Sequence, residues 1–318
     1  MPPHLAEPSL STLPNPLARY ILATRPAFLS VTFVACLIGL ATAYFSGFSA
    51  QPDKALVTIF FALVAHGGIN VVNDYYDAMN GSDAANHERI FPFTGGSRFI
   101  QNGVLSRKRM GIFGYAQLFA VIPAGVWLMR VSGADLFWIG LTGLTIGWAY
   151  SAPPLKLMCR GMGEPAIALG WTLVVAGADF VQRGQLSLLP WLAGFPFALL
   201  VTNILYINQF PDRQADASVG KRTLIVRLGP QSASWGYLLI ALLSYGLMLF
   251  LVGKSILPIY AVAGAFALPL SFTAAHKLIH HASEPARLSG AIKRTIVAAN
   301  LSGILLAAGL LFAALASF

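Results

Sequence analysis

Two short acidic segments, far apart in the chain, contain residue types that can bind metal ions and phosphate groups. Each consists of an asparagine, an aspartate four residues later and a second aspartate shortly after, at the end of a long apolar stretch. These residues are Asn73, Asp77 and Asp83 in the first segment and Asn208, Asp212 and Asp216 in the second. Residues four apart lie on one face of a helix. Asn73 and Asp77 are therefore expected to point the same way, and so are Asn208, Asp212 and Asp216.

If the two segments face each other, several carboxylates share one site. Such a cluster repels itself and raises its own pKa values unless a cation neutralises it. Mg²⁺ prefers carboxylate and phosphate oxygens, so the pattern predicts a magnesium–diphosphate site. The predicted metal ligands are Asp77, Asp83, Asp212 and Asp216. The basic residues expected to meet the remaining phosphate charge are Lys156, Lys221, Arg222 and Arg89.

A single aspartate at a helix end is usually a solvated cap rather than a metal ligand. Two segments with the same asparagine–aspartate spacing make that reading less favourable here, because a chance match is needed twice. The sequence therefore favours a shared site over two unrelated caps.

The composition indicates that a membrane surrounds these segments. The chain is 56% hydrophobic and 10% charged, with a mean hydropathy of +0.68, whereas soluble domains are roughly 25% charged. The net charge of +9 could suggest nucleic acid. The basic residues, however, lie in short gaps between apolar stretches, which indicates an anionic membrane surface and no nucleic-acid partner.

The apolar stretches predict an all-α bundle of nine transmembrane helices, since about 20 residues cross the hydrocarbon core. Residues 1–24 are expected to form an N-terminal tail, and 25–318 a single transmembrane domain. The predicted spans are 26–52, 55–73, 110–129, 136–155, 165–178, 184–211, 228–253, 255–276 and 295–318.

The basic residues predict how this bundle lies in the membrane. Seventeen of the 21 lysines and arginines fall on the side that holds the N-terminus and both acidic segments. Positive residues favour the cytoplasmic side. The N-terminus and the acidic loops are therefore predicted to be cytoplasmic and the C-terminus outside, with a bacterial inner membrane as the expected location.

One helix should carry a polar stripe that leads to the first acidic segment. His66, Asn70, Asn73 and Asp77 share one face at helical spacing. Lipid does not satisfy polar groups, so this face must point into the bundle. For His66 itself, a hydrogen-bonded interior role is favoured over contact with substrate.

Three motifs in this chain resemble the UbiA superfamily of intramembrane aromatic prenyltransferases. They are Asn73-Asp-Tyr-Tyr-Asp77-x-x-x-Gly81-x-Asp83, Asp212-x-x-x-Asp216-x-x-x-Gly220-Lys221-Arg222-Thr223 and Tyr150-Ser-Ala-Pro-Pro-Leu-Lys156. The resemblance implies nine helices around a central cavity, Mg²⁺ as cofactor, and a polyprenyl diphosphate and an aromatic acceptor as partners within the lipid bilayer. It also implies catalytic roles for Asp77, Asp212 and Tyr150, with Tyr150 near the reacting prenyl carbon. Asn73 and Asn208 are expected to bind the diphosphate or prenyl group.

The first motif departs from the common family pattern in a way that concerns the acceptor. Gly81 stands where many members have an aspartate, and Asp83 follows two residues later. This offset, with Thr94-Gly-Gly-Ser97-Arg98 downstream, resembles the menaquinone branch, which prenylates 1,4-dihydroxy-2-naphthoate. The alternatives are the same chemistry on 4-hydroxybenzoate, homogentisate or a glyceryl phosphate, or a membrane transporter, although transporters typically place their polar sites near the bilayer midplane.

Overall fold

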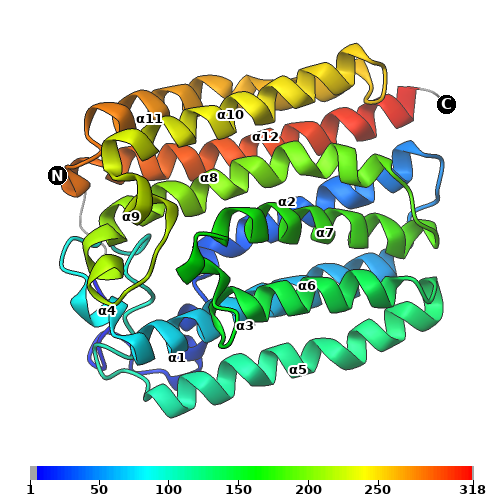
Figure 1. The fold of residues 1–318 in the computed structure, drawn as a ribbon. Coiled ribbons are helices and arrows are strands. Elements are labelled where there is room, and N and C mark those ends of the chain that lie inside the picture. The colour runs from blue at the N-terminus through cyan, green and yellow to red at the C-terminus, as the bar shows by residue number, and fades with distance from the viewer. Residues whose placement is uncertain (1–5, 317–318) are drawn as a thin grey trace.

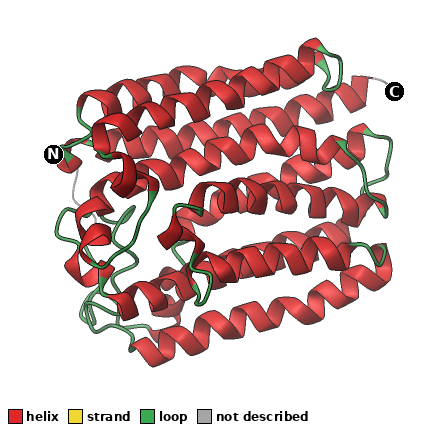
Figure 2. Cartoon of the chain, in the orientation of Figure 1, coloured by secondary structure: helices red, strands yellow, loops and turns green. Residues whose placement is uncertain are grey.

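The computed structural model describes residues 6–316, and every regular element in that range is helical (Figure 2). The long helices run side by side as one bundle (Figure 1), which confirms the predicted all-α class. They are α2 (Pro26–Phe45), α3 (Pro52–Asn80), α5 (Arg107–Ser132), α6 (Leu136–Ser151), α7 (Gly163–Arg183), α8 (Leu189–Ser218), α10 (Pro230–Gly253), α11 (Leu268–His280) extended by the 3₁₀ segment Ile259–Ala267, and α12 (Ser289–Ala316).

The number of spans differs from the prediction. Within residues 6–316, eight segments are long and apolar enough to cross a membrane. The exception among the predicted spans is α6, which has 16 residues and is shorter than the roughly 20 needed. It ends at Ser151 because the residue before a proline disfavours the helical region, and Ala152 precedes Pro153 with an extended ψ of 143°. The total of nine is therefore not confirmed.

The predicted span 165–178 is part of a longer helix than its apolar run suggested. Asp179, which ends that run, lies inside α7 with its charge paired. Its Oδ2 is 2.6 Å from the Arg183 Nε, and its Oδ1 accepts a hydrogen bond of 2.8 Å from the Thr42 hydroxyl. Pairing removes most of the cost of burying a carboxylate, so the helix continues through it.

Helix ends follow local sequence signals. Proline occupies the first turn of α2, α3, α8 and α10, where its missing N–H costs no hydrogen bond. Helix α3 ends at Gly81, whose φ of 87° lies in the left-handed region that glycine tolerates. The chain therefore turns sharply directly after the first acidic segment.

Close helix packing at the centre of the bundle depends on small residues. Gly39 on α2 leaves no room for a Cβ against the Val175 carbonyl and Ala178 of α7. Helix backbones in membrane bundles approach each other at such positions. Around this contact a core forms from buried apolar side chains of several helices, among them Ile38, Phe197, Met248 and Leu306.

The two ends of the bundle differ. The short helices α1 (Pro16–Ala23), α4 (Ser82–Ala85) and α9 (Leu224–Leu228) gather at one end with the long connections, and the opposite end has short turns (Figure 1). Helices α3 and α8 both finish at the first of these ends. The fold thus brings both acidic segments to one end, although about 130 residues separate them.

Candidate active site

The acidic ends of α3 and α8 meet at a buried lysine. Lys221 follows α8, and its Nζ lies 2.6 Å from Asp77 Oδ1 and 3.2 Å from Asp216 Oδ1. All three residues are buried. Burial alone opposes the ammonium charge, but the carboxylates of Asp77 and Asp216 outweigh it and raise the pKa of Lys221 above its usual value. One cation of the chain therefore joins the two segments.

Asn73 links the first segment to a third helix. Its Nδ2 donates to Asp77 Oδ2 at 3.2 Å and to the Ser151 hydroxyl at 2.9 Å. Ser151 is the last residue of α6 and follows Tyr150 directly. The asparagine thus fixes the end of α6, and with it Tyr150, relative to Asp77.

Asp83 lies beside these groups on the short helix α4. The turn at Gly81 places it there, and Gly96 packs so closely against its carboxylate that a Cβ has no room. Burial first, and then the nearby charges of Asp77 and Asp74, raise the pKa of Asp83 well above its usual range. The carboxylate stands in a strongly anionic environment that a cation would relieve.

Asp212 is held by the loop that follows α4. Its Oδ1 accepts a short hydrogen bond from Asn86 Nδ2, and Thr94 and the Gly95 backbone provide further hydrogen bonds. Because this loop comes from the first acidic segment and Asp212 from the second, the contact joins the two segments a second time.

The other predicted phosphate-binding residues lie at different depths. Lys156 and Arg222 are exposed at this end of the bundle, and the Arg222 N–H donates to the Cys159 carbonyl at 2.9 Å. Arg89 instead forms an ion pair of 2.7 Å with Glu7 of the N-terminal tail. The structure therefore brings Lys221 into the carboxylate cluster and leaves the other three bases outside it.

Several buried oxygens in this region have no hydrogen-bond partner. Among them are Asn208 Oδ1 on α8 and Asp74 Oδ1 on α3. An unpaired buried oxygen is costly, and groups of this kind often receive a ligand, ion or water. The donor set at this end of the bundle, with carboxylate and amide oxygens, suits a hard divalent cation.

The carboxylates are close but do not by themselves enclose an ion. Among residues 6–316, no three Asp, Glu, His or Cys side chains are grouped closely enough to hold a metal. The carboxylates are occupied by other partners. Lys221 lies between Asp77 and Asp216, and Asp212 accepts a hydrogen bond from Asn86.

The polar stripe on α3 points into the bundle, as the sequence predicts. The Nδ1 of His66 is 2.7 Å from the Thr32 hydroxyl of α2, and its ring packs edge-on against Trp171. Asn70 donates to the Thr24 carbonyl at 3.0 Å. His66 is thus a hydrogen-bonded interior histidine.

Sequence reasoning missed several residues that hold the site. Asn86 contacts Asp212 but lies outside the motif, and its only sequence signal is its place three residues after Asp83. Arg98, part of the noted Thr-Gly-Gly-Ser-Arg stretch, donates through Nη1 to the Asp83 carbonyl. Glu7 lies in the tail, where no spacing pattern indicates a partner.

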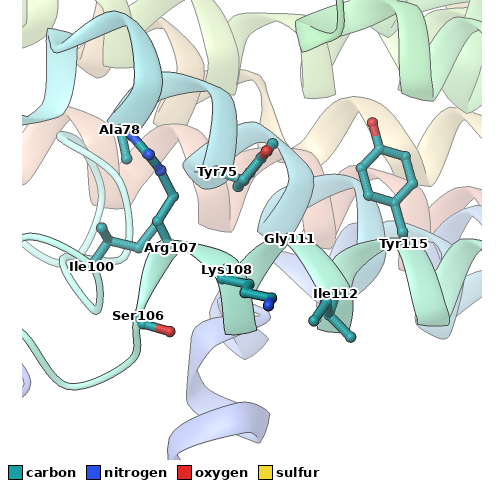
Figure 3. A pocket seen from close by; sticks show the side chains of 9 residues that line it. All are labelled: Tyr75, Ala78, Ile100, Ser106, Arg107, Lys108, Gly111, Ile112 and Tyr115. Atoms are coloured by element: carbon teal, nitrogen blue, oxygen red, sulfur yellow. The ribbon is translucent and has the colours of Figure 1, made fainter.

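A hollow of about 770 Å³ is lined by residues of α3, α5 and the loop that precedes α5 (Figure 3). Its lining contains none of the predicted site residues; it consists of Tyr75, Ala78, Ile100, Ser106, Arg107, Lys108, Gly111, Ile112 and Tyr115. The hollow is therefore separate from the carboxylate cluster, and the central cavity implied by the family resemblance stays a prediction.

Comparison with known proteins identifies similar chains. The profile of the UbiA prenyltransferase family matches residues 32–294. The 1,4-dihydroxy-2-naphthoate octaprenyltransferase of Escherichia coli is 28% identical over 302 residues, which cover 92% of this chain and 94% of that protein. UbiA prenyltransferase domain-containing protein 1 of Xenopus tropicalis is 28% identical over 270 residues, covering 80% and 74% of the two chains.

Solved structures share the fold. A UbiA homologue from Archaeoglobus fulgidus bound to DMAPP and Mg²⁺ has a TM-score of 0.62 at 16% sequence identity, and the match covers 91% of this chain and 99% of that one. An apo UbiA homologue from Aeropyrum pernix also has a TM-score of 0.62, with coverage of 91% and 98%. At this level of identity, these structures indicate a common architecture.

Proposed function

Because the chain belongs to the UbiA prenyltransferase family, we propose that it transfers a polyprenyl group from an isoprenyl diphosphate to 1,4-dihydroxy-2-naphthoate, a step of menaquinone biosynthesis. The observation that carries this proposal is the meeting of two acidic segments at one buried cation, Lys221. The reaction is assigned to residues 25–318, with the N-terminal tail outside the transmembrane domain. A transporter role is not favoured, because the family is one of transferases and the carboxylates lie at the helix ends.

The donor set fits magnesium. We assign Asp77, Asp83, Asp212 and Asp216 as the residues that would hold Mg²⁺, in keeping with the raised pKa of Asp83 and the solved relative that contains Mg²⁺. When bound, the metal would neutralise the negative charge that develops on the departing diphosphate.

Several residues would bind the diphosphate and orient it. Lys221 is already inside the cluster and presents an ammonium that pairs with phosphate oxygens as well as with carboxylates. The unpaired Asn208 Oδ1 and the Asn73 amide lie on the two helices that carry the aspartates. Lys156 and Arg222, exposed at the same end, provide positive charge for the approaching anionic substrate.

Tyr150 would act on the prenyl group rather than on the diphosphate. It lies at the end of α6, held there by the hydrogen bond between Asn73 and Ser151. An aromatic face stabilises an allylic cation without attacking it. The apolar walls of the bundle would exclude water, which competes with the acceptor for that cation.

Acceptor choice gives a direct test of the proposal. With one prenyl donor and Mg²⁺, we expect kcat/KM to be at least about tenfold higher for 1,4-dihydroxy-2-naphthoate than for 4-hydroxybenzoate, since a misfit acceptor commonly costs 1–3 kcal/mol. The motivating features are the glycine turn at Gly81, which shifts the second carboxylate to Asp83, and the naphthoate-using relative.

Product mass spectrometry and pyrophosphate release would measure both reactions side by side. Preference for the single-ring acid would overturn the acceptor and leave the transferase class standing. No pyrophosphate release with any acceptor would contradict the whole proposal.

The membrane orientation is also proposed and testable. We place the protein in a bacterial inner membrane with the acidic segments cytoplasmic, because seventeen of the 21 basic residues lie on that side. In a Cys159→Ser background, Ala84→Cys and Ala217→Cys should react with a membrane-impermeant thiol reagent only from the cytoplasmic face, whereas Gln185→Cys should react only from outside. All three replaced side chains are exposed. Labelling of Ala84→Cys and Ala217→Cys from opposite faces would be incompatible with one shared site.

A further inference from the structure

The N-terminal tail places one carboxylate between two arginines of the site loop. Glu7 Oε1 lies 2.7 Å from the Arg89 Nε, and Glu7 Oε2 lies 3.6 Å from the Arg98 Nε. Asn102 adds a hydrogen bond of 3.1 Å to Oε2. A single side chain of the tail therefore contacts three positions of the connection between α4 and α5.

Each of the two arginines in turn holds a backbone carbonyl next to a site residue. Arg89 Nη1 donates to the Asn86 carbonyl at 2.6 Å, and the side chain of that asparagine holds Asp212. Arg98 Nη1 donates to the carbonyl of Asp83 itself. Two paths thus run from Glu7, one to each acidic segment. The path through Arg89 consists of hydrogen bonds, whereas the path through Arg98 begins with the ion pair at 3.6 Å and continues with a hydrogen bond to Asp83.

Further contacts hold the tail against this loop. Asn102 Nδ2 also donates to the Pro8 carbonyl at 3.0 Å, and Leu13 packs against a buried cluster that includes Phe99 and Val104. Arg98 is buried and has a φ of 67°, a left-handed conformation that persists in a non-glycine residue only when its surroundings fix it. Glu7 is the acidic partner that the structure gives this arginine.

We propose that Glu7 is a positioning residue for the active site. Glu7 holds Arg89 and Arg98, and through these arginines it keeps Asp83 and Asp212 at the spacing needed for metal and diphosphate binding. This inference rests on the proposed function. It assigns Arg89 a role different from direct phosphate binding, because its guanidinium is directed to the tail and to the Asn86 carbonyl. Small displacements of metal and substrate ligands are expensive, since an error near 1 Å can cost about a hundredfold in rate.

The full-length Glu7→Gln enzyme tests the inference. It keeps the shape of the side chain but removes the charge that attracts both arginines. We expect kcat/KM for the prenyl diphosphate to fall about tenfold and the Mg²⁺ concentration for half-maximal rate to rise. Asp135→Asn, the same charge change at an exposed residue without an ion pair at the far end of the bundle, should behave like the native enzyme.

Two further measurements separate positioning from general stability. Arg89→Gln should cause a loss of similar size, and the Glu7→Gln, Arg89→Gln double variant should lose little more than either single variant, because both act through one contact. Hydrogen exchange of the resting, metal-free protein should quicken in residues 83–105. It should stay unchanged in α10, with which the described tail residues form no hydrogen bond or ion pair.

Native-like kinetics of Glu7→Gln, additive losses in the double variant, or exchange that quickens equally in α10 would each overturn the positioning role. These results differ from failure of the proposed function, in which the native enzyme itself would release no pyrophosphate with Mg²⁺ and a prenyl diphosphate.

Discussion

Asp77→Asn and Asp212→Asn should each lower kcat by roughly 100- to 1000-fold while the protein still folds and inserts into membranes. Each substitution removes one charge from the cluster that would hold Mg²⁺ and the diphosphate, and a single preorganised electrostatic contact is worth this much in many enzymes. Asparagine retains the size and the hydrogen-bonding oxygen of aspartate, so the contacts from Asn73 and Asn86 can persist. Pyrophosphate release at saturating donor and acceptor measures the effect.

A control for this experiment lies on the same helix. Asp53→Asn changes an exposed aspartate in the first turn of α3, at the end of the bundle remote from the cluster, and should retain native activity. Raising Mg²⁺ should recover part of the loss in the Asp77 and Asp212 variants, because weaker binding is offset by mass action. Near-normal turnover of both variants at limiting Mg²⁺ would show that the acidic segments do not perform the proposed chemistry.

Lys221→Met should destabilise the resting protein and make its stability depend on Mg²⁺. The lysine is buried between Asp77 and Asp216, and removing one partner of a buried ionic group costs about 3–5 kcal/mol because the remaining charges are unpaired. This corresponds to a fall in Tm of roughly 5–10 °C. Mg²⁺ without substrate should then raise the Tm more in the variant than in the native protein, since a divalent ion can neutralise the carboxylates that the ammonium no longer reaches.

Thermal unfolding in detergent, with and without Mg²⁺, tests this second prediction without any need for turnover. Lys293→Met is the matched control, because Lys293 is exposed at the same end of the bundle and forms no ion pair in the described structure. An unchanged Tm in Lys221→Met, or an equal Mg²⁺ response in all three proteins, would mean that Lys221 is not the cation that balances the cluster.

The sequence determined the class of the fold and the residue types of the site. Apolar runs of about 20 residues predict membrane helices because the hydrocarbon core leaves backbone groups no other partner. The count of nine is not confirmed because of α6, where Pro153 ends the helix before the apolar run itself ends. The polar stripe from His66 to Asp77 could be predicted from the sequence, because helical spacing determines which residues share a face.

Only the tertiary structure decided which groups contact each other. The motif spacing predicts that Asp77 and Asp216 belong to one site, but not that Lys221 lies between them or that Asn86 holds Asp212. The Lys221–Asp77 and Asn86–Asp212 contacts join segments more than a hundred residues apart, and the packing of the helices brings those segments together. Glu7 is the clearest case, because its partner Arg89 lies 82 positions away and no periodicity connects a tail to a loop. The helical repeat lets the sequence predict which neighbouring residues share a helix face. Contacts between residues far apart in the chain form only when the chain folds, so the sequence pattern does not predict them.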